Sequence, residues 1–346
     1  MRHVKTKVAL GVTLGLLCEI SHAGSLVWEN DIFNQINRRE STDRYYTQGM
    51  RFVTERNPTD TNLVSDGILR WLSGNGAAVA TNRHYLTFGQ TIYTPRSITM
   101  PTEEESDRSY AAWMFAGLMA VRVQEIDYRL GLRFVERIDR VEAQLGVVGP
   151  MALGEPVQKT FHEIIGSDDP KGWDRQLRNS AGATVLWDRK WQSQAYGRNE
   201  RLSFDAIPGI GLMAGNIQSY MHAECVVRMA VFSALPSPWS PEVIPQSTPM
   251  SDIRSGQVSS LDTRIGFYLF VGGDARLYAN NGLIEGMDSD DFGRPMEPLV
   301  HDFKMGFGLT IPEGIHFVFA YILRSEEFEG QDGRQEFGSV AVSTDF

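Results

Sequence analysis

One segment of the chain, residues 149–166, places a histidine, an amide and a carboxylate at helical spacing between glycine-bounded ends. Pro156 suits the first turn of a helix, and Gly166 suits its end. At 100° per residue, three polar side chains share one face of this helix: Glu155, Gln158 and His162. The other face is apolar and carries Val157, Phe161 and Ile164, with Ile165 at the boundary. The pattern predicts either the wall of an active site or a surface helix whose polar face is only solvated.

Two segments near the start of the chain could supply oxygen ligands for a metal ion. Asn30 and Asp31 place an amide carbonyl beside a carboxylate, and Thr47 adds a hydroxyl. Ca²⁺ takes six to eight oxygen ligands in loose geometry, so this set suits Ca²⁺. It suits Zn²⁺ poorly, because no cluster of cysteine and histidine accompanies it. The alternative interpretation is structural, with Asn-Asp marking a turn and Thr-Asp at 42–43 capping a loop.

A hydrolase built from these parts would use one of two nucleophiles. The chain contains no Gly-x-Ser-x-Gly motif, so the nucleophile is either water deprotonated by His162 or a serine that the sequence does not identify. With Ca²⁺ nearby, water is the simpler choice, because the ion can bind the ester carbonyl and stabilise the developing oxyanion. Gln158 and Asp168 are the nearest groups in the sequence that could hold the histidine in one tautomer.

The first 23 residues have the features of a secretory signal peptide. Basic residues at positions 2, 5 and 7 precede an apolar run over 8–17, and Ser21-His22-Ala23 ends in a small-x-small cleavage pattern. The apolar run is too short to span a bilayer as a helix. Cleavage after Ala23 would leave Cys225 as the only cysteine, so the mature protein could form no internal disulfide.

The rest of the chain alternates in the way that transmembrane β-strands do. Over 314–323, Phe317, Phe319, Tyr321 and Leu323 share one face. The chain ends in a second such segment, in which Val340, Val342, Thr344 and Phe346 share a face opposite small or polar residues. Apolar residues on one face with small or polar residues on the other are typical of a strand in a membrane barrel. A terminal aromatic residue resembles the assembly signal of bacterial outer-membrane proteins.

Thirteen segments are candidate strands. They are Ser25–Phe33, Tyr45–Glu55, His84–Ile92, Tyr110–Val123, Tyr128–Glu136, Val141–Val148, Ala183–Trp191, Leu202–Met213, Tyr220–Phe232, Thr263–Tyr278, Val300–Ile311, Gly314–Arg324 and Glu336–Phe346. A bacterial barrel needs an even number of strands. Two neighbours between 110 and 148 are therefore expected to be parts of one long strand. We predict an all-β protein, an antiparallel transmembrane β-barrel of about 12 strands, with a short helix in an extracellular loop.

Four polar segments are expected to be loops: Asn57–Asp66, Thr99–Arg108, Pro236–Gln257 and Met287–Pro298. Residues 24–346 are expected to form a single domain, because a barrel cannot be divided without opening an edge. The formal net charge of −10 argues against nucleic acid as a partner.

Several motifs, in the same order, resemble the outer-membrane lipid A deacylase (LpxR) family. The helix segment contributes Gly146-Val147-Val148-Gly149-Pro150, Ala152, Gly154-Glu155, Val157-Gln158, His162, Ile164-Ile165-Gly166 and Gly172-Trp173. Asn30-Asp31, the block Asp43-Arg44-Tyr45-Tyr46-Thr47-x-Gly49 and Asp107-Arg108-x-Tyr110-Ala111 are also similar to that family. These motifs lie within about residues 25 to 190, and the strand spacing is compatible as far as the C-terminus.

The resemblance implies a twelve-stranded barrel in the outer membrane whose active site lies near the outer leaflet beneath a small loop helix. It implies Ca²⁺-dependent hydrolysis of the ester-linked 3′ acyloxyacyl chain of lipid A, the lipid of lipopolysaccharide. The protein is expected to be a monomer. His162 would be the general base, supported by Gln158 and Asp168. Asn30, Asp31 and Thr47 would belong to the Ca²⁺ and carbonyl site.

The chain departs from the family pattern at one point. The family places a functional lysine shortly after the segment that corresponds to Tyr93-Thr94-Pro95, but here Arg96-Ser97-Ile98-Thr99-Met100 follows. Either Arg96 carries the positive charge or the substrate phosphates are held differently. Arg96 and Arg44 are therefore the candidate substrate-binding residues.

Two other functions stay open on the sequence. A phospholipase-type barrel would use a serine nucleophile together with His162. A non-enzymatic barrel would act as a pore or a structural protein.

Overall fold

The computed structural model describes residues 24–31, 44–56, 63–73, 80–99, 107–196, 202–231, 265–311 and 315–344. The predicted signal peptide and cleavage site, the terminal Phe346 and the predicted loop Pro236–Gln257 lie outside these residues.

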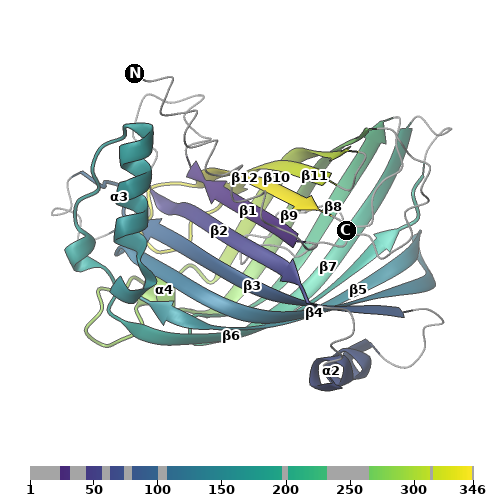
Figure 1. The fold of residues 1–346 in the computed structure, drawn as a ribbon, viewed down its shortest axis with the longest axis horizontal. Coiled ribbons are helices and arrows are strands. Elements are labelled where there is room, and N and C mark those ends of the chain that lie inside the picture. Colours follow the sequence, from purple (N-terminus) through teal and green to yellow (C-terminus); the bar gives the residue numbers. More distant parts are fainter. Residues whose placement is uncertain are drawn as a thin grey trace.

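Twelve antiparallel strands form a closed barrel (Figure 1). They are β1 Gly24–Asn30, β2 Tyr45–Glu55, β3 Ala80–Thr94, β4 Ala111–Leu130, β5 Leu132–Val148, β6 Ser180–Ser193, β7 Leu202–Gly215, β8 Gln218–Val231, β9 Gly266–Asn281, β10 Leu299–Ile311, β11 Ile315–Arg324 and β12 Gln335–Thr344. Each strand pairs with its neighbours in the sequence, and β1 pairs with β12 to close the sheet. The predicted fold class is confirmed.

The region between 110 and 148 holds two strands, as expected, but their boundary differs from the prediction. The predicted segment Tyr128–Glu136 is wrong as a strand, because it contains the turn between β4 and β5. That turn is made at Gly131, whose φ of +73° is a backbone conformation that favours glycine. Alternating residues continue on both sides of the turn, so the periodicity of the sequence does not reveal its position.

The helices lie in the connections between strands. They are α2 Leu63–Ser73, α3 Gly154–Ile165 and the short α4 Gly282–Glu285, with 3₁₀ turns η2 Pro150–Ala152 and η3 Trp173–Arg175. The predicted loop Asn57–Asp66 is therefore wrong at its end, which is the first turn of α2. None of the helices in the described part of the chain is long and apolar enough to cross a membrane. In Figure 1, α3 and α2 lie at opposite ends of the barrel.

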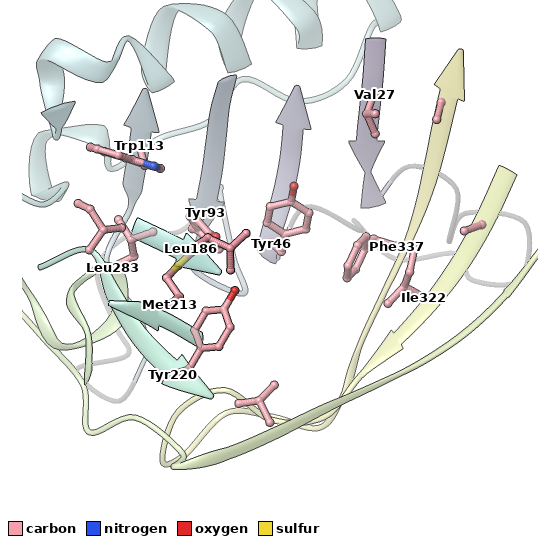
Figure 2. Close-up of a cluster of buried hydrophobic side chains, with 14 of the residues drawn as sticks. Val27, Tyr46, Tyr93, Trp113, Leu186, Met213, Tyr220, Leu283, Ile322 and Phe337 are labelled. Atoms are coloured by element: carbon pink, nitrogen blue, oxygen red, sulfur yellow. The ribbon is translucent and has the colours of Figure 1, made fainter. Parts of the chain in front are cut away.

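Strand alternation separates an inner and an outer face. On β12, Ser339, Ala341 and Ser343 are buried, whereas Val340 and Val342 are only partly buried. The inward aromatic and aliphatic side chains meet in one cluster that includes Tyr46, Tyr93 and Phe337 (Figure 2). The dyad pattern read from the sequence therefore places small and polar residues inside, as expected for a membrane barrel.

Ion pairs also cross the barrel interior. Arg51 on β2 lies 2.7 Å from Glu142 on β5. Glu224 on β8 lies 2.7 Å from Lys190 on β6 and 3.1 Å from Lys304 on β10. These strands are not neighbours in the sheet, so the side chains meet inside the lumen over the strands that separate them, as Lys190 and Glu224 do over Gly209 of β7. Paired charges that occupy the interior disfavour the porin-like alternative, in which water fills the channel.

Candidate active site

The register of the first four strands shows which side chains share a face. One row across β1 to β4 consists of Glu29, Gly49, Thr91 and Trp113. Trp113 belongs to the inner cluster, so this row faces the lumen. The next row consists of Asn30, Gln48, Ile92 and Ala112. Because successive residues of a strand alternate, this second row lies on the outer wall of the barrel.

The α3 segment packs against that outer wall. Gln90 of β3, which is on the outer face, donates a 2.6 Å hydrogen bond from Nε2 to the carbonyl oxygen of Ala152. The rings of Trp28 on β1 and Phe161 on α3 meet edge to face, with centroids 6.0 Å apart. Figure 1 shows α3 beside the ends of β1 and β2. The helix therefore covers the outside of the barrel and does not plug its mouth.

A glycine allows the start of α3 to approach the wall closely. A Cβ added at Gly154 would lie 2.5 Å from the Trp173 ring and 2.6 Å from the Ala112 Cβ. Ala112 and Trp173 are buried together with Ile92, and Val157 packs against the same group. This small apolar cluster between helix and wall holds α3 in place.

The polar face of α3 is the buried one. Gln158 is 1% exposed and His162 is 2% exposed, so the interpretation as a merely solvated surface helix is wrong. The helix ends at Gly166, as predicted, with φ of +74°. Ile165 is 39% exposed, because a helix on the outside of a barrel has one side turned away from the protein. Glu155 is an exception on the polar face, since it forms a half-exposed 2.7 Å ion pair with Lys159 and raises the pKa of that amine.

A backbone carbonyl fixes the tautomer of His162. Nδ1 of the imidazole is hydrogen-bonded to the carbonyl oxygen of Asp168. A carbonyl can only accept, so Nδ1 carries the proton and Nε2 is the basic nitrogen. The sequence suggested Asp168 as the partner of His162, but its side chain is exposed and the main chain makes the contact.

A tryptophan orients the amide of Gln158. Nε1 of Trp173 donates a 2.9 Å hydrogen bond to Oε1 of Gln158. The amide nitrogen Nε2 is therefore turned the other way, and it is buried with no hydrogen-bond partner among the described residues. Trp173 lies in a motif that resembles the family, but the sequence assigns it no role. The signal was available, because a buried indole N–H requires an acceptor.

The oxygen-bearing residues lie at the α3 ends of β1 and β2. Asn30, Asp31 and Thr47 are each at most 2% exposed. Oδ2 of Asp31 accepts a 3.1 Å hydrogen bond from the backbone N–H of Arg44. A register shift between Tyr46 and Gln48 makes Thr47 the extra residue of a β-bulge, which re-aims its side chain.

Thr94 of β3 is a further residue of this group that the sequence did not indicate. Its Oγ1 lies 2.8 Å from Oγ1 of Thr47, and either hydroxyl can be the donor. Thr94 is fully buried. The contact holds the Thr47 hydroxyl in one orientation, and only the pairing of β2 with β3 brings the two threonines together.

The donor atoms fit a hard cation better than a soft one. Among the residues that the structure describes, no three His, Cys, Asp or Glu side chains are grouped to hold a metal. Asn30, Asp31 and Thr47 instead offer amide, carboxylate and hydroxyl oxygens, which are the ligand types of Ca²⁺. Buried oxygens from two adjacent strands are chemically compatible with that ion.

The two candidate substrate-binding arginines lie near the rim at the α3 end. Arg96 follows β3 and forms a 2.6 Å ion pair with Asp332, with both side chains about half exposed. Arg44 precedes β2 and donates a 3.4 Å hydrogen bond from Nη2 to the carbonyl oxygen of Arg334. The guanidinium groups of Arg44 and Arg96 therefore both contact the connection between β11 and β12.

The contact between Trp28 and Phe161 connects the two halves of the candidate site. Phe161 directly precedes His162, and Trp28 is two residues before Asn30 on the same outer face of β1. The structure thus brings α3 and the end of β1 to one side of the wall. The arrangement places the imidazole of His162, the amide of Gln158 and the end of β1 on the outer side of the barrel wall.

Comparisons with known proteins found a matching family model and similar solved structures. A family model described as "Outer membrane protein LpxR" matches residues 10–346. Among solved structures, LpxR from Salmonella typhimurium superposes with a TM-score of 0.67 at 18% identity, covering 94% of this chain and 100% of that one. The β domain of the Bordetella autotransporter BrkA gives a TM-score of 0.46 at 7% identity, covering 94% and 100%. A search of curated proteins found no match.

Proposed function

The chain belongs to the LpxR family of outer membrane proteins, and on this premise we propose that it is a lipid A 3′-O-deacylase. The substrate is the ester that joins the 3′ acyloxyacyl chain to the sugar of lipid A. The reaction is hydrolysis by water, with His162 as general base. The active site faces the outer leaflet, and the enzyme acts as a monomer.

One observation carries the proposal. The buried polar pair of α3, Gln158 and His162, lies between the helix and the outer wall of the barrel rather than in the lumen. A substrate that diffuses in the membrane meets the outer wall directly. A polar site at this position suits a lipid with an ester near the membrane surface.

The exposed apolar residues around α3 support a lipid substrate. Met151, Leu153 and Ile165 are 57%, 50% and 39% exposed. They precede and end the helix that covers the site. Apolar side chains at this position can contact acyl chains without the cost of exposure to water.

His162 supplies the proton transfers. Nε2 takes a proton from water while the water oxygen bonds to the ester carbonyl carbon. The Asp168 carbonyl, on the other side of the ring, stabilises the imidazolium that forms. When the carbon–oxygen bond to the sugar breaks, Nε2 returns the proton to the leaving 3′ oxygen. The products are a carboxylic acid and a free hydroxyl group.

Gln158 and the oxygens of β1 and β2 act on the carbonyl. The Nε2 amide group of Gln158 can donate a hydrogen bond to the oxyanion of the tetrahedral intermediate, because Trp173 already occupies its Oε1. Asn30, Asp31 and Thr47 would hold Ca²⁺, which would polarise the ester carbonyl when bound. Arg44 and Arg96 would contact the phosphates of the substrate.

Mass spectrometry of lipid A from cells that express the chain tests the proposal. We expect the loss of one 3′ acyloxyacyl group, and no loss with His162→Gln. His301→Gln is a matched control, because His301 is exposed on β10. Unchanged lipid A from cells with folded, surface-exposed wild-type barrel would refute the proposal. Labelling by a serine-directed fluorophosphonate together with phospholipid hydrolysis would instead identify the phospholipase alternative.

A further inference from the structure

Helix α2 also packs on the outer wall, but at the end of the barrel opposite to α3. Oδ1 of Asp66 accepts a 2.8 Å hydrogen bond from Nδ2 of Asn82. The carbonyl oxygen of Leu72 accepts a 2.7 Å hydrogen bond from Nη2 of Arg189. Leu69, between them, is fully buried. Asn82 and Arg189 share a row with Arg122 and Asp139, and Arg122 lies on the same face of β4 as Ala112, so this row is on the outer wall.

The wall beneath α2 carries charge where the outer face would otherwise be apolar. We call Arg122, Arg137, Asp139 and Arg189 the wall cluster. Nε of Arg189 and Nε of Arg137 lie 2.7 Å and 3.4 Å from the Asp139 carboxylate. The cluster has three guanidinium groups and one carboxylate, so it is cationic. Such a cluster is expensive in hydrocarbon and must lie outside it.

The change from apolar to charged occurs at one level on three adjacent strands. Toward α3, the outer face of β4 carries Ala116 and Leu118, that of β5 carries Ala143 and Leu145, and that of β6 carries Ala183 and Val185. Leu118, Leu145 and Val185 are 50%, 70% and 51% exposed. The wall cluster follows on the same faces after one or two more outward positions. The cluster therefore marks the edge of the hydrocarbon layer.

Aromatic residues flank this edge. The guanidinium carbon of Arg189 lies 5.4 Å from the ring centre of Trp187 and 6.0 Å from that of Trp191. Tryptophan is enriched at the boundary between membrane and water. The position of the two tryptophans agrees with the level assigned to the wall cluster.

The side of α2 that is turned away from the wall also combines apolar and cationic residues. Trp71 is 82% exposed and Ile68, one turn earlier, is 42% exposed. Arg70 between them is exposed as well. A helix with a large aromatic residue, an aliphatic residue and a cation on its free side is suited to the interfacial layer of a bilayer.

We propose that α2 is a membrane-surface helix that seats the barrel in the phospholipid headgroup layer at this end. Ile68 and Trp71 insert at the boundary of the acyl chains, and the exposed Arg70 contacts headgroup phosphates, while the wall cluster beneath α2 adds positive charge. Charge complementarity selects a lipid with an anionic headgroup, because the cluster and Arg70 together are cationic. Continuity with the apolar outer face of β4, β5 and β6 argues for lipid over a soluble partner. With α3 toward the outer leaflet, as proposed above, this is the periplasmic leaflet.

Depth measurement with a nitroxide spin label tests the proposal. The full chain, with Cys18 and Cys225 replaced by serine, is labelled at Trp71→Cys and reconstituted into phosphatidylcholine vesicles with and without phosphatidylglycerol. Leu118→Cys, on the exposed apolar face, is the deep reference, and Asp290→Cys, in the exposed β9–β10 connection, is the aqueous reference. Collision with oxygen relative to a nickel chelate reports the depth of each label.

We expect the label at position 71 to read between the two references, and to read deeper when phosphatidylglycerol is present. Arg70→Glu should remove the effect of phosphatidylglycerol. A reading equal to that of Asp290→Cys in both vesicles would overturn the proposal. So would a label that is aqueous in vesicles but becomes buried in native outer-membrane fragments, because that result would identify a protein as the occupant. The heat-dependent shift of the folded barrel on gels confirms that each variant is assembled.

Discussion

Trp173 and Gln158 form a hydrogen bond of 2.9 Å that runs from the indole N–H to the amide oxygen. The bond decides which end of the amide faces the candidate site, because an indole can only donate. It leaves the NH₂ group of Gln158 on the same buried face as His162, one turn away. The indole of Trp173 thus sets the direction of the Gln158 amide from within a buried apolar cluster.

Replacing Trp173 with phenylalanine removes this bond and keeps an aromatic ring against Tyr110. The amide of Gln158 can then rotate, so we expect kcat for lipid A deacylation to fall on the order of tenfold, below the loss for removal of an oxyanion donor. Steady-state kinetics of the purified barrel would measure it. Trp71→Phe is the matched control and should leave kcat unchanged. If Trp173→Phe has the kcat of the wild type, the orientation of the Gln158 amide does not affect catalysis.

Adding a methyl group at Gly154 tests whether the distance between α3 and the wall matters. The new Cβ would lie 2.6 Å from that of Ala112, so Gly154→Ala should push the helix outward and lower the activity while the barrel still assembles. The double variant Gly154→Ala/Ala112→Gly frees the space on the wall side and should recover part of the activity. Gly67→Ala in α2, where an added Cβ meets no atom within 4 Å, should have no effect. Equal activity of all three variants would contradict a site between α3 and the wall.

Removing divalent cations tests the proposed Ca²⁺ site. We expect EGTA to abolish deacylation, and added Ca²⁺ but not Zn²⁺ to restore it, because the buried donors are oxygens. Asp31→Asn removes the one carboxylate of the proposed set and should raise the Ca²⁺ concentration needed for half-maximal activity. Activity that is unchanged in EGTA, with the purified enzyme free of bound metal by elemental analysis, would exclude the site.

The cross-lumen pair of Arg51 and Glu142 should contribute to stability rather than to catalysis. Both side chains are fully buried, and Thr87 and Gln144 donate further hydrogen bonds to the same carboxylate at 2.9 Å and 3.0 Å. Arg51→Met leaves that carboxylate without its cation, and we expect a loss of about 3–5 kcal/mol in the free energy of unfolding. Urea unfolding in vesicles measures it.

A surface pair provides the control for that measurement. Arg133 forms an exposed 2.9 Å ion pair with Asp127, and Arg133→Met should leave stability nearly unchanged because water screens the pair. If Arg51→Met and Arg133→Met both unfold at the same urea concentration as the wild type, the pair of Arg51 and Glu142 does not contribute to stability. The double variant Arg51→Met/Glu142→Met should be more stable than Arg51→Met alone.

Much of the fold follows from the sequence because its signals are local. The alternation around Phe317 and Val340 determines which residues lie inside and outside the barrel, and Gly166 ends α3 where its backbone needs a positive φ. The identity of the helix and the polar character of one face were also readable. These properties depend on residues a few positions apart, and short-range sterics and periodicity decide them.

Other features depended on partners far away in the chain. The sequence could not tell whether the face with Gln158 and His162 was solvated or buried, because the covering surface comes from β1 to β4. Three further features could not be predicted from the sequence: the burial of Leu69, the contact of Thr47 with Thr94, and the orientation that Trp173 gives to the Gln158 amide. A strand pattern defines two faces but not what covers each face. When the sheet closes into a barrel, one face of each strand lines the lumen and the other face contacts the membrane or α3. Only the tertiary structure decides which face is which.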